Sequence, residues 1–379
     1  MMAQKMFDLF NMRRLVILFC LILFTKLFGW EFKKPLNIPR SFLIAPSVLG
    51  KIYAIGGIKM NGEITNIVEE YDFLRDTWII KKPMPQKRYD MGFAVFDNKI
   101  YVFGGVSRSS SGRPIILRDL NVYDPLLDTW FCKRPLPSPR AGACGVAINN
   151  RIFVFGGYDY SENYLDDVLI YDIERDSWLF YGNMPRPRAR MAISYYQPIV
   201  HIIGGEFYGP TNRHYYLNLN NNNWDTLMPL PFRRYGFFSS HFDNKIFIFG
   251  GEYSCHGQRY FFKRVDIYDC NNDSWYLGDS FNLARSYAGC GLLNNPYGNF
   301  LYIVGGSTSS GITGSMEIYQ LSGIKEESNK INKEDNKKII GVYDLLGKKI
   351  KKNNLKKGIY FYLIKDKNNY YLKKKIVIK

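Results

Sequence analysis

Metal-binding and disulfide-forming side chains are scarce in this sequence. It has 4 histidines and 6 cysteines among 379 residues, with no CxxC pair and no Cys/His spacing typical of zinc. Once Cys20 is set aside with the N-terminal segment, five cysteines remain, and an odd number does not make a disulfide framework. We therefore expect no metal, no cofactor and no disulfide network.

A long apolar run is also missing at the N-terminus. The apolar stretch from Leu15 to Phe24 has ten residues, too few to cross a hydrocarbon layer of ~30 Å as a helix. It follows Arg13-Arg14 and precedes Gly29, an order typical of a secretory signal peptide. We predict that residues 1–29 are a signal peptide, that no stable transmembrane segment remains after cleavage, and that the protein is secreted or attached to the cell surface.

The positive charge of the chain is concentrated at its C-terminus. The formal net charge is +17, but residues 323–379 hold 17 of the 51 Lys and Arg and only 6 of the 34 Asp and Glu. The segment 30–322 keeps a net charge of only +3. A nearly neutral body argues against a nucleic-acid partner, because a nucleic-acid groove needs a basic surface.

What the sequence does contain is a repeat with a period of about 50 residues, which is typical of propellers and solenoids. A strand-like run ending in Gly-Gly occurs six times, as in KIYAIGG and RIFVFGG. Most are followed by Tyr-Asp, a polar turn and Trp, as in YDFLRDTW, which predicts two further strands. The glycine pairs are Gly56-Gly57, Gly104-Gly105, Gly156-Gly157, Gly204-Gly205, Gly250-Gly251 and Gly305-Gly306.

Each repeat also has an arginine ten residues after a tryptophan. The sixth block ends in MEIYQL without a tryptophan, whereas Trp30 precedes Arg40 at the start of the mature chain. We therefore predict that the N-terminal strand supplies the outer strand of the last blade and closes the ring, which conceals exposed sheet edges. The arginines are Arg40, Arg88, Arg140, Arg188, Arg234 and Arg285.

Together these features resemble the kelch family: Gly-Gly ending the second strand, Tyr in the third, Trp in the fourth, and Pro-Leu-Pro-x-x-Arg leading into the next blade. The resemblance covers residues 30–321 and implies an all-β, six-bladed propeller. Kelch propellers serve as substrate adaptors, scaffolds, oxidases and sugar mutarotases, so the fold does not give the function.

The segments that follow the Gly-Gly pairs vary most in length and composition, whereas the other turns are short and similar. Variable loops on a fixed scaffold carry recognition, and aromatic and planar cationic side chains suit sugars, carboxylates and peptides. We predict a binding module for a glycan or a peptide or protein ligand, using the loops of blades 3 to 5. The candidates are Tyr158, Tyr160, Tyr164, Phe207, Tyr208, Arg213, Tyr253, His256, Arg259 and Tyr260.

The six arginines are expected to open onto the same face as these loops, because the loops share that face with the connections between blades. A repeated position usually serves packing, so they should brace the inter-blade connections. In kelch substrate adaptors that bind acidic peptides, arginines in this register line the binding face. Both roles are therefore open.

An enzymatic alternative rests on a second resemblance. Kelch copper oxidases use tyrosines, histidines and a cysteine, and no such motif aligns here. Bacterial sialic acid mutarotases are similar in size, signal peptide and blade number, and a glutamate carries their chemistry. In GGEFYGPTNR, Glu206 could transfer a proton while Arg213 holds the substrate carboxylate. Glu252 has the equivalent position in blade 5, which weakens this alternative.

The C-terminus is predicted to be a separate segment. Residues 322–338 are polar and charged, as in a linker. Residues 339–379 contain three alternating β segments with Gly347 and Gly358 at turns, and the order VYDLLGKK, LKKGIYFYLI, KKIVIK is similar to the C-terminal sorting domain of type IX secretion. The resemblance implies a sorting or anchoring tail that contacts secretion machinery.

Overall fold

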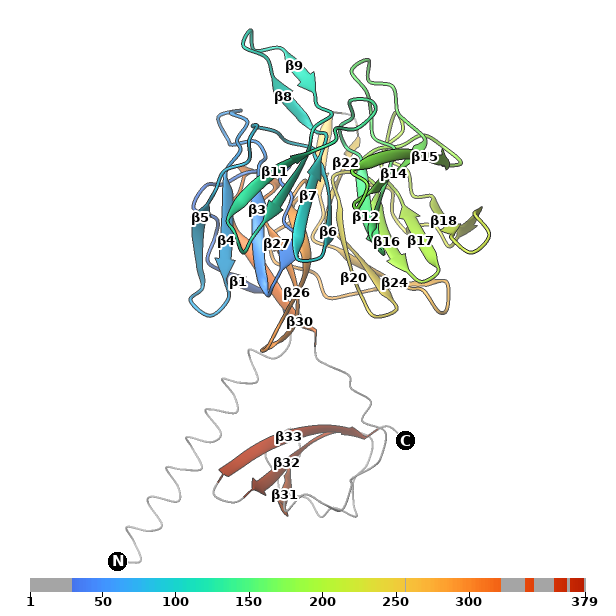
Figure 1. Cartoon of the computed structure of the whole chain (residues 1–379). Coiled ribbons are helices and arrows are strands. Elements are labelled where there is room, and N and C mark those ends of the chain that lie inside the picture. Colours follow the sequence, from blue (N-terminus) through green and yellow to red (C-terminus); the bar gives the residue numbers. More distant parts are fainter. Residues whose placement is uncertain (1–28, 256, 322–337, 344–357, 367–368, 378–379) are drawn as a thin grey trace, which may run out of the picture. The chain divides into compact units, whose positions relative to one another are not determined.

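The computed structural model describes residues 29–255, 257–321, 338–343, 358–366 and 369–377. Within these residues all regular elements are β-strands, and six four-stranded sheets stand around one axis as the blades of a propeller (Figure 1). The predicted all-β, six-bladed fold is confirmed. Within the described part of the chain no helix has the length and apolarity to cross a membrane.

Five blades are built from consecutive stretches of chain, with the first strand innermost. Blade 1 has β2 (Ser47–Val48), β3 (Lys51–Ile55), β4 (Val68–Asp72) and β5 (Thr77–Lys81). Blade 2 has β6 (Gly92–Phe96), β7 (Lys99–Phe103), β10 (Leu120–Asp124) and β11 (Thr129–Lys133). Blade 3 has β12 (Cys144–Ile148), β13 (Arg151–Phe155), β14 (Asp167–Asp172) and β15 (Ser177–Asn183).

Blade 4 has β16 (Ala192–Tyr196), β17 (Ile199–Ile203), β18 (His214–Asn218) and β19 (Asn223–Leu227). Blade 5 has β20 (Phe238–Phe242), β21 (Lys245–Phe249), β24 (Val265–Asp269) and β25 (Ser274–Leu277). Blade 6 has β26 (Gly289–Asn295), β27 (Gly298–Val304), β30 (Met316–Leu321) and, from the other end of the chain, β1 (Glu31–Lys33). Small hairpins follow three Gly-Gly pairs: β8 (Val106–Arg108) with β9 (Pro114–Ile116), β22 (Glu252–Cys255) with β23 (Gln258–Phe261), and β28 (Ser307–Thr308) with β29 (Gly311–Ile312).

Closure of the ring by the N-terminal strand is confirmed. β1 pairs antiparallel with β30, with Glu31 opposite Ile318. The preceding Trp30 is buried, packs edge-on against Phe249 and Phe281, and donates a hydrogen bond from Nε1 to the Asp279 carbonyl at 2.9 Å. Strand pairing and an aromatic anchor therefore hold the two ends of the propeller together.

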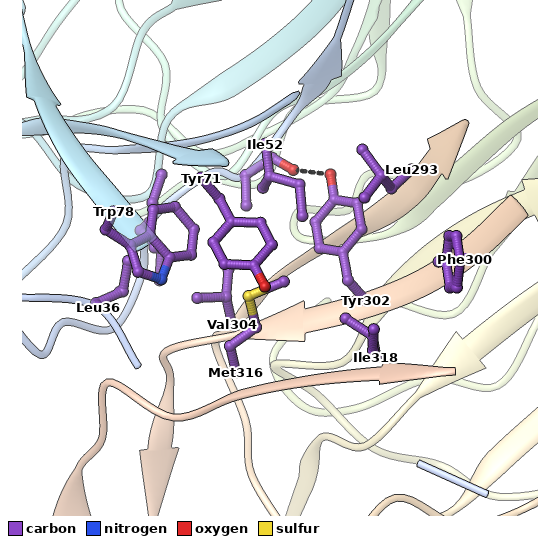
Figure 2. Close-up of a cluster of buried hydrophobic side chains, with 13 residues drawn as sticks. Leu36, Ile52, Tyr71, Trp78, Leu293, Phe300, Tyr302, Val304, Met316 and Ile318 are labelled. Carbon is purple, nitrogen blue, oxygen red and sulfur yellow. Dashed lines mark hydrogen bonds between the residues drawn. The ribbon is translucent and has the colours of Figure 1, made fainter. Parts of the chain in front are cut away.

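Apolar side chains from neighbouring blades fill the spaces between the sheets. Figure 2 shows one such core, where Tyr71 and Trp78 of blade 1 lie near Tyr302 and Phe300 of blade 6. The Tyr302 hydroxyl is fully buried and donates to the Ala45 carbonyl at 2.5 Å, so its polar atom is satisfied within the core.

Tryptophan and aspartate together clasp the end of the previous blade. Trp78 Nε1 donates to the Lys34 carbonyl at 2.8 Å, and the Lys34 amide donates to Asp76 at 2.9 Å. The same arrangement recurs for Trp130, Trp178 and Trp275. This repeated clasp explains why Trp recurs with an acidic residue two positions earlier.

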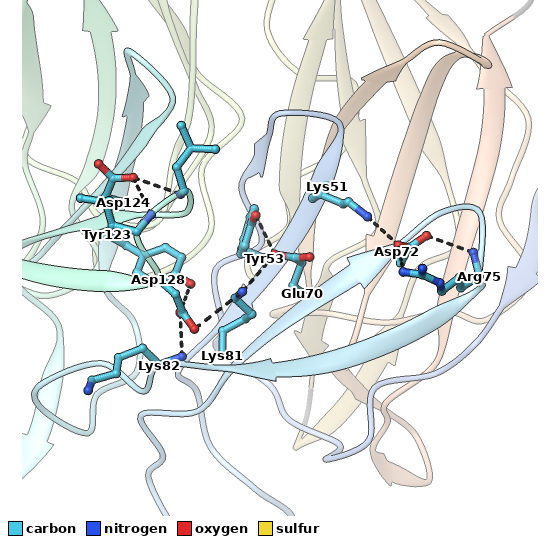
Figure 3. Close-up of polar contacts among 12 residues, drawn as sticks. Lys51, Tyr53, Glu70, Asp72, Arg75, Lys81, Lys82, Tyr123, Asp124 and Asp128 are labelled. Carbon is cyan, nitrogen blue, oxygen red and sulfur yellow. Dashed lines mark hydrogen bonds and ion pairs between the residues drawn. The ribbon is translucent and has the colours of Figure 1, made fainter.

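Charged side chains continue the contact between blades 1 and 2 at the surface. Tyr53 donates to Glu70 at 2.9 Å, and Lys81 lies between Glu70 (3.8 Å) and Asp128 (3.6 Å), as Figure 3 shows. Exposed ion pairs contribute little individually, so the apolar core between the sheets carries most of this contact.

Blade 4 departs from the repeat in its core. Leu217 replaces the tyrosine, and two histidines lie side by side, with His201 Nδ1 and His214 Nε2 3.0 Å apart. The His214 ring meets the buried Tyr268 of blade 5 edge-on at 4.6 Å. Burial lowers the pKa of His201 to about 4 and of His214 to about 3, so both rings are neutral near neutral pH.

The C-terminal part is a separate three-stranded antiparallel sheet of β31 (Lys338–Tyr343), β32 (Gly358–Asp366) and β33 (Asn369–Val377), with β32 in the middle. Three β segments were predicted and three strands are present, although Gly358 begins β32 instead of forming a turn. All of the predicted signal peptide except Gly29 (residues 1–28 of 1–29), most of the linker (322–337 of 322–338) and Gly347 lie outside the described residues. The sorting role of the tail stays a prediction.

Candidate functional site

The loops that follow the Gly-Gly pairs are joined to the connections between blades by short β-bridges. Tyr158 pairs with Ala141, Glu206 with Ala189, and Glu252 with Tyr235. In each case the residue after Gly-Gly meets the residue after the repeat arginine in the connection that leads into the same blade. The two kinds of segment therefore share one face of the propeller, here called the loop face.

The six arginines are buried beneath the loop face, with 0–1% of each residue exposed. Each of four donates Nη1 to the carbonyl of the first glycine of a pair, at 3.1–3.3 Å, and carboxylates neutralise several of them, such as Glu317 beside Arg285 at 2.5 Å. The expectation that they open onto the binding face is therefore corrected: their guanidinium groups brace the blade connections and have no exposed surface for a ligand. The four are Arg88, Arg140, Arg188 and Arg285.

Two residues after each arginine, the backbone turns into the left-handed region, with φ between +49° and +62°. At five of these six positions the backbone amide donates to the carbonyl of the residue at the same position in the preceding blade, for example Arg190 to Gly142 at 2.7 Å and Phe42 to Tyr287 at 2.8 Å. We call this ring the collar. Its members are Phe42, Asp90, Gly142, Arg190, Gly236 and Tyr287.

Arg190 fills the collar with its side chain. Its Nη2 lies 2.8 Å from Asp90 Oδ2, and its Nη1 lies 2.6 Å from Glu206 Oε2. The Tyr158 hydroxyl donates to Asp90 at 2.7 Å, and Phe42 and Tyr287 stack on each other at 3.8 Å, with the guanidinium 5.8 Å from each ring. Burial opposes the charge of Arg190, but Asp90 and Glu206 outweigh it and raise its pKa well above the ordinary value.

A second carboxylate–guanidinium pair lies beside the first, on blade 5. Arg259 donates Nε and Nη2 to the two oxygens of Glu252 at 3.2 and 2.5 Å, and the Ser286 hydroxyl donates to the same carboxylate at 2.9 Å. Glu252 is 2% exposed, whereas the Arg259 side chain is 51% exposed. Arg259 is thus a cation that a ligand can reach.

The environment of Glu206 raises its pKa. Burial is the largest cause and Asp90 adds to it, whereas Arg190, through its charge and its hydrogen bond, and the Tyr287 hydroxyl, through its hydrogen bond, act in the opposite direction. Arg213, predicted as its partner, is exposed and makes no ion pair with Glu206 in the described part of the chain. The structure therefore brings Glu206 together with Arg190 instead.

Exposed aromatic side chains lie on the same loops of blades 3 to 5 that carry charged groups, and we call these aromatic side chains the rim. The exposed fractions are 66% for Tyr160, 75% for Tyr208, 41% for Phe207 and 51% for Tyr260. Tyr164 of the blade 3 loop meets Tyr208 of the blade 4 loop at 5.2 Å between ring centres, so these loops support each other.

The other predicted ligand-binding residues are less exposed or are not described. Tyr158 and Tyr253 are half-buried, and Tyr158 is held at the collar by Asp90. His256 lies outside the described residues.

Sequence reasoning missed the collar and its charged members. Asp90, Arg190 and Tyr287 each lie two positions after a repeat arginine, and the residue types at this position differ in almost every blade. The sequence did offer one indication: the second residue after the repeat arginine changes from blade to blade, although the residues around it repeat. Left-handed backbone at non-glycine residues is costly and concentrates at functional sites.

Beneath the collar lies an axial cavity of about 190 Å³, lined mainly by apolar residues of the innermost strands. Cys144 and Cys290 are among its lining residues, and burial raises the pKa of the Cys144 thiol to about 12. Among the described residues no group of three or more His, Cys, Asp or Glu side chains is placed to hold a metal ion.

Comparisons with known proteins place the propeller in a family. Residues 52–312 match the family model described as the Attractin/LZTR1 beta-propeller. A solved protein described as "Structure of YjhT" superposes with a TM-score of 0.66 over 77% of this chain and 97% of that chain, at 18% identity, which shows likeness of fold alone.

Curated relatives carry kelch names. Kelch-like protein terF of Aspergillus terreus is 28% identical over 253 residues, covering 62% of this chain and 55% of that protein. Kelch-like protein 25 of Xenopus tropicalis is 26% identical over 247 residues, covering 64% of this chain and 41% of that protein. The chain thus spans about half the length of these relatives. The matched family model and the six kelch-type blades show that this chain belongs to the Attractin/LZTR1 beta-propeller family.

Proposed function

We propose that this propeller is an exported binding module that recognises a glycan or a peptide with the loops of blades 3 to 5. The observation that carries the proposal is the exposed aromatic rim, in which Tyr160, Tyr208 and Tyr260 are each more than half exposed on the loops of blades 3 to 5. Exposed aromatic groups rimmed by polar residues mark interaction sites on soluble proteins.

The chemistry of the rim supports recognition by stacking and hydrogen bonding. Flat rings with a polar hydroxyl offer an apolar face to a sugar or a side chain and a hydrogen-bonding group at the edge. The contacts between Tyr164 and Tyr208 and between Phe207 and Tyr208 order the loops before a ligand arrives. Loops that are ordered in advance lose less conformational entropy on binding.

Export is part of the same proposal and rests on the sequence of both ends. The N-terminal segment has the order of a signal peptide, and the tail is similar to a type IX sorting domain. Secretion machinery would then be a transient partner, and the mature protein would act at the cell surface or outside the cell.

Ligand binding can be tested with the full chain on glycan and peptide arrays, followed by affinity measurement. Tyr208→Ala and Tyr260→Ala are expected to weaken binding at least about tenfold, because stacked aromatic residues dominate interface energy. Tyr297→Ala is the matched control, since Tyr297 is 52% exposed but lies in the β26–β27 turn, at the opposite end of the strands. Equal affinity of the rim variants and the wild type would reject the proposed face.

A sugar mutarotase, of the sialic acid type, is the second candidate, and one observation favours it. Glu206 is 8% exposed, has a raised pKa and is hydrogen-bonded by Arg190 and Tyr287, as a proton-transfer group requires. Anomer exchange measured by proton NMR tests it. Faster exchange that disappears in Glu206→Gln supports an enzyme, whereas ligand saturation without faster exchange supports a binding module.

A further inference from the structure

We infer that the ligand of the loop face is an uncharged, hydroxylated sugar unit and not an acidic sugar or an acidic peptide. This inference rests on the proposed binding function and names the class of ligand. It follows from three features of the floor inside the aromatic rim: its charge balance, the hydrogen bonds already made by its arginines, and the charges in the surrounding loop tips.

The floor carries more negative than positive charge. The carboxylates of Asp90, Glu206 and Glu252 face the guanidinium groups of Arg190 and Arg259, which leaves one net negative charge. Asp90 and Glu252 side chains are 8% and 3% exposed, so solvent screens them weakly. An incoming carboxylate would meet this negative charge in a poorly hydrated place, where like charges repel strongly.

The two arginines also have few donors left for an anion. Arg190 directs Nε and Nη2 to Asp90 and Nη1 to Glu206. Arg259 binds Glu252 in the bidentate manner, which is the geometry that it would need for a carboxylate ligand. An acidic ligand could bind either guanidinium in the bidentate manner only by displacing a buried carboxylate, and that displacement leaves a buried charge unpaired.

The loops of blades 3 and 4, which face the collar beside Glu206, add no net positive charge. Asp159 and Glu162 belong to the blade 3 loop, and Arg213 is the one cation of the blade 4 loop. A cationic ligand fits no better at the floor, because the guanidinium groups of Arg190 and Arg259 lie on the carboxylates that would attract it.

A neutral diol meets none of these penalties. Its hydroxyl groups can accept from the exposed edge of Arg259 and donate to Glu206, the less deeply buried of the two glutamates, so it uses the ion pairs without breaking them. The apolar face of the sugar ring can stack on Tyr208 or Tyr260 at the rim, where both rings are more than half exposed. Recognition of this kind depends little on salt, because no net charge is neutralised.

The test uses the full chain with sugars that share one ring and differ in charge: glucose, glucosamine and glucuronic acid, and the matching galactose series, with sialic acid added. Saturation-transfer NMR and titration are run at low and high salt. In at least one series we expect the neutral member to bind about tenfold or more tightly than its charged counterparts, with little change between the salts. Preference for an acidic or a basic member would overturn the inference and leave the binding module standing.

Charge-neutral variants give an independent readout. Glu206→Gln and Glu252→Gln remove negative charge from the floor, so each is expected to improve the affinity for the acidic member relative to the neutral one. Glu63→Gln is the control, since Glu63 is an exposed carboxylate of the blade 1 loop paired with Lys59 and Lys87. Unchanged selectivity in both floor variants would contradict the inference, and binding of a peptide in place of every sugar would overturn it while preserving the proposed function. Silence toward all sugars and all peptides would instead reject both.

Discussion

Arg190 and Asp90, 100 positions apart in the sequence, bind each other across the collar, with 2.8 Å between Nη2 and Oδ2. One residue enters blade 4 and the other enters blade 2, so their ion pair ties together blades that are not neighbours. Glu206 of the blade 4 loop binds the same guanidinium. Arg190 therefore links the collar to the loop face that is proposed to bind the ligand.

Replacing Arg190 should destabilise the protein. Arg190→Ala leaves Asp90 and Glu206 without their cation in a largely buried place, and breaking such a pair costs about 3 kcal/mol or more. The free energy of unfolding measured with urea checks this. Arg213→Ala is the control, since Arg213 is exposed. A loss below ~0.5 kcal/mol for Arg190→Ala would show that the collar does not depend on its ion pairs.

Ring closure should depend on Trp30. Trp30→Ala removes a buried ring that packs on Phe249 and Phe281, and loss of a buried tryptophan costs about 3–5 kcal/mol. Phe32→Ala in the same strand is the control, since Phe32 is 57% exposed. Deletion of residues 30–40 should abolish the cooperative unfolding transition, and an unchanged melting curve would contradict closure by β1.

Acid should weaken blade 4 through its buried histidines. Their folded pKa values of about 4 and about 3 lie below the ordinary value of 6.5, so the unfolded chain takes up protons first as the pH falls. The stability that the neutral pair contributes is complete above pH 6.5 and is lost as the pH falls from there toward the folded pKa values.

A variant with His201→Phe and His214→Val isolates this effect, because Phe153 and Val168 occupy the equivalent positions in blade 3. Urea unfolding at a series of pH values between 7 and 4 should give a flatter profile for the variant than for the wild type. Parallel profiles would show that the pair does not control the acid response.

Crowding by the Tyr287 ring should make Gly236 of the collar intolerant of substitution. A Cβ atom at Gly236 would lie 2.8 Å from the Tyr287 ring, and the backbone φ of +62° already disfavours other residues. Gly236→Ala is expected to lower stability by about 1–3 kcal/mol and to displace Tyr287. Gly62→Ala is the control, because its φ is +78° but no atom lies within 4 Å of the added carbon. Similar losses in both variants would mean that backbone strain alone decides the outcome.

The propeller scaffold could be predicted from the repeats, because the blades share the same strand pattern and most share the same Trp–Asp clasp. Six Gly-Gly pairs and the spacing from Trp30 to Arg40 were enough to predict blade number and closure. The burial of the six arginines was harder to predict. The sequence shows that an arginine recurs, but not that Arg285, for example, donates hydrogen bonds to Glu317 and to the Gly305 carbonyl. The partner of Glu206 was missed for the same reason: Arg213 is near in sequence, whereas Arg190 becomes its neighbour only when the ring closes.

The bond from Asn282 Nδ2 to the Trp30 carbonyl joins residues 252 positions apart. The ribosome releases Trp30 long before it releases β30, so β1 has no partner until the sixth blade emerges. Such distant pairing slows folding relative to local contacts. The β1–β30 pair thus works as a completeness check, because a chain that ends before β30 leaves β1 unpaired and the ring open.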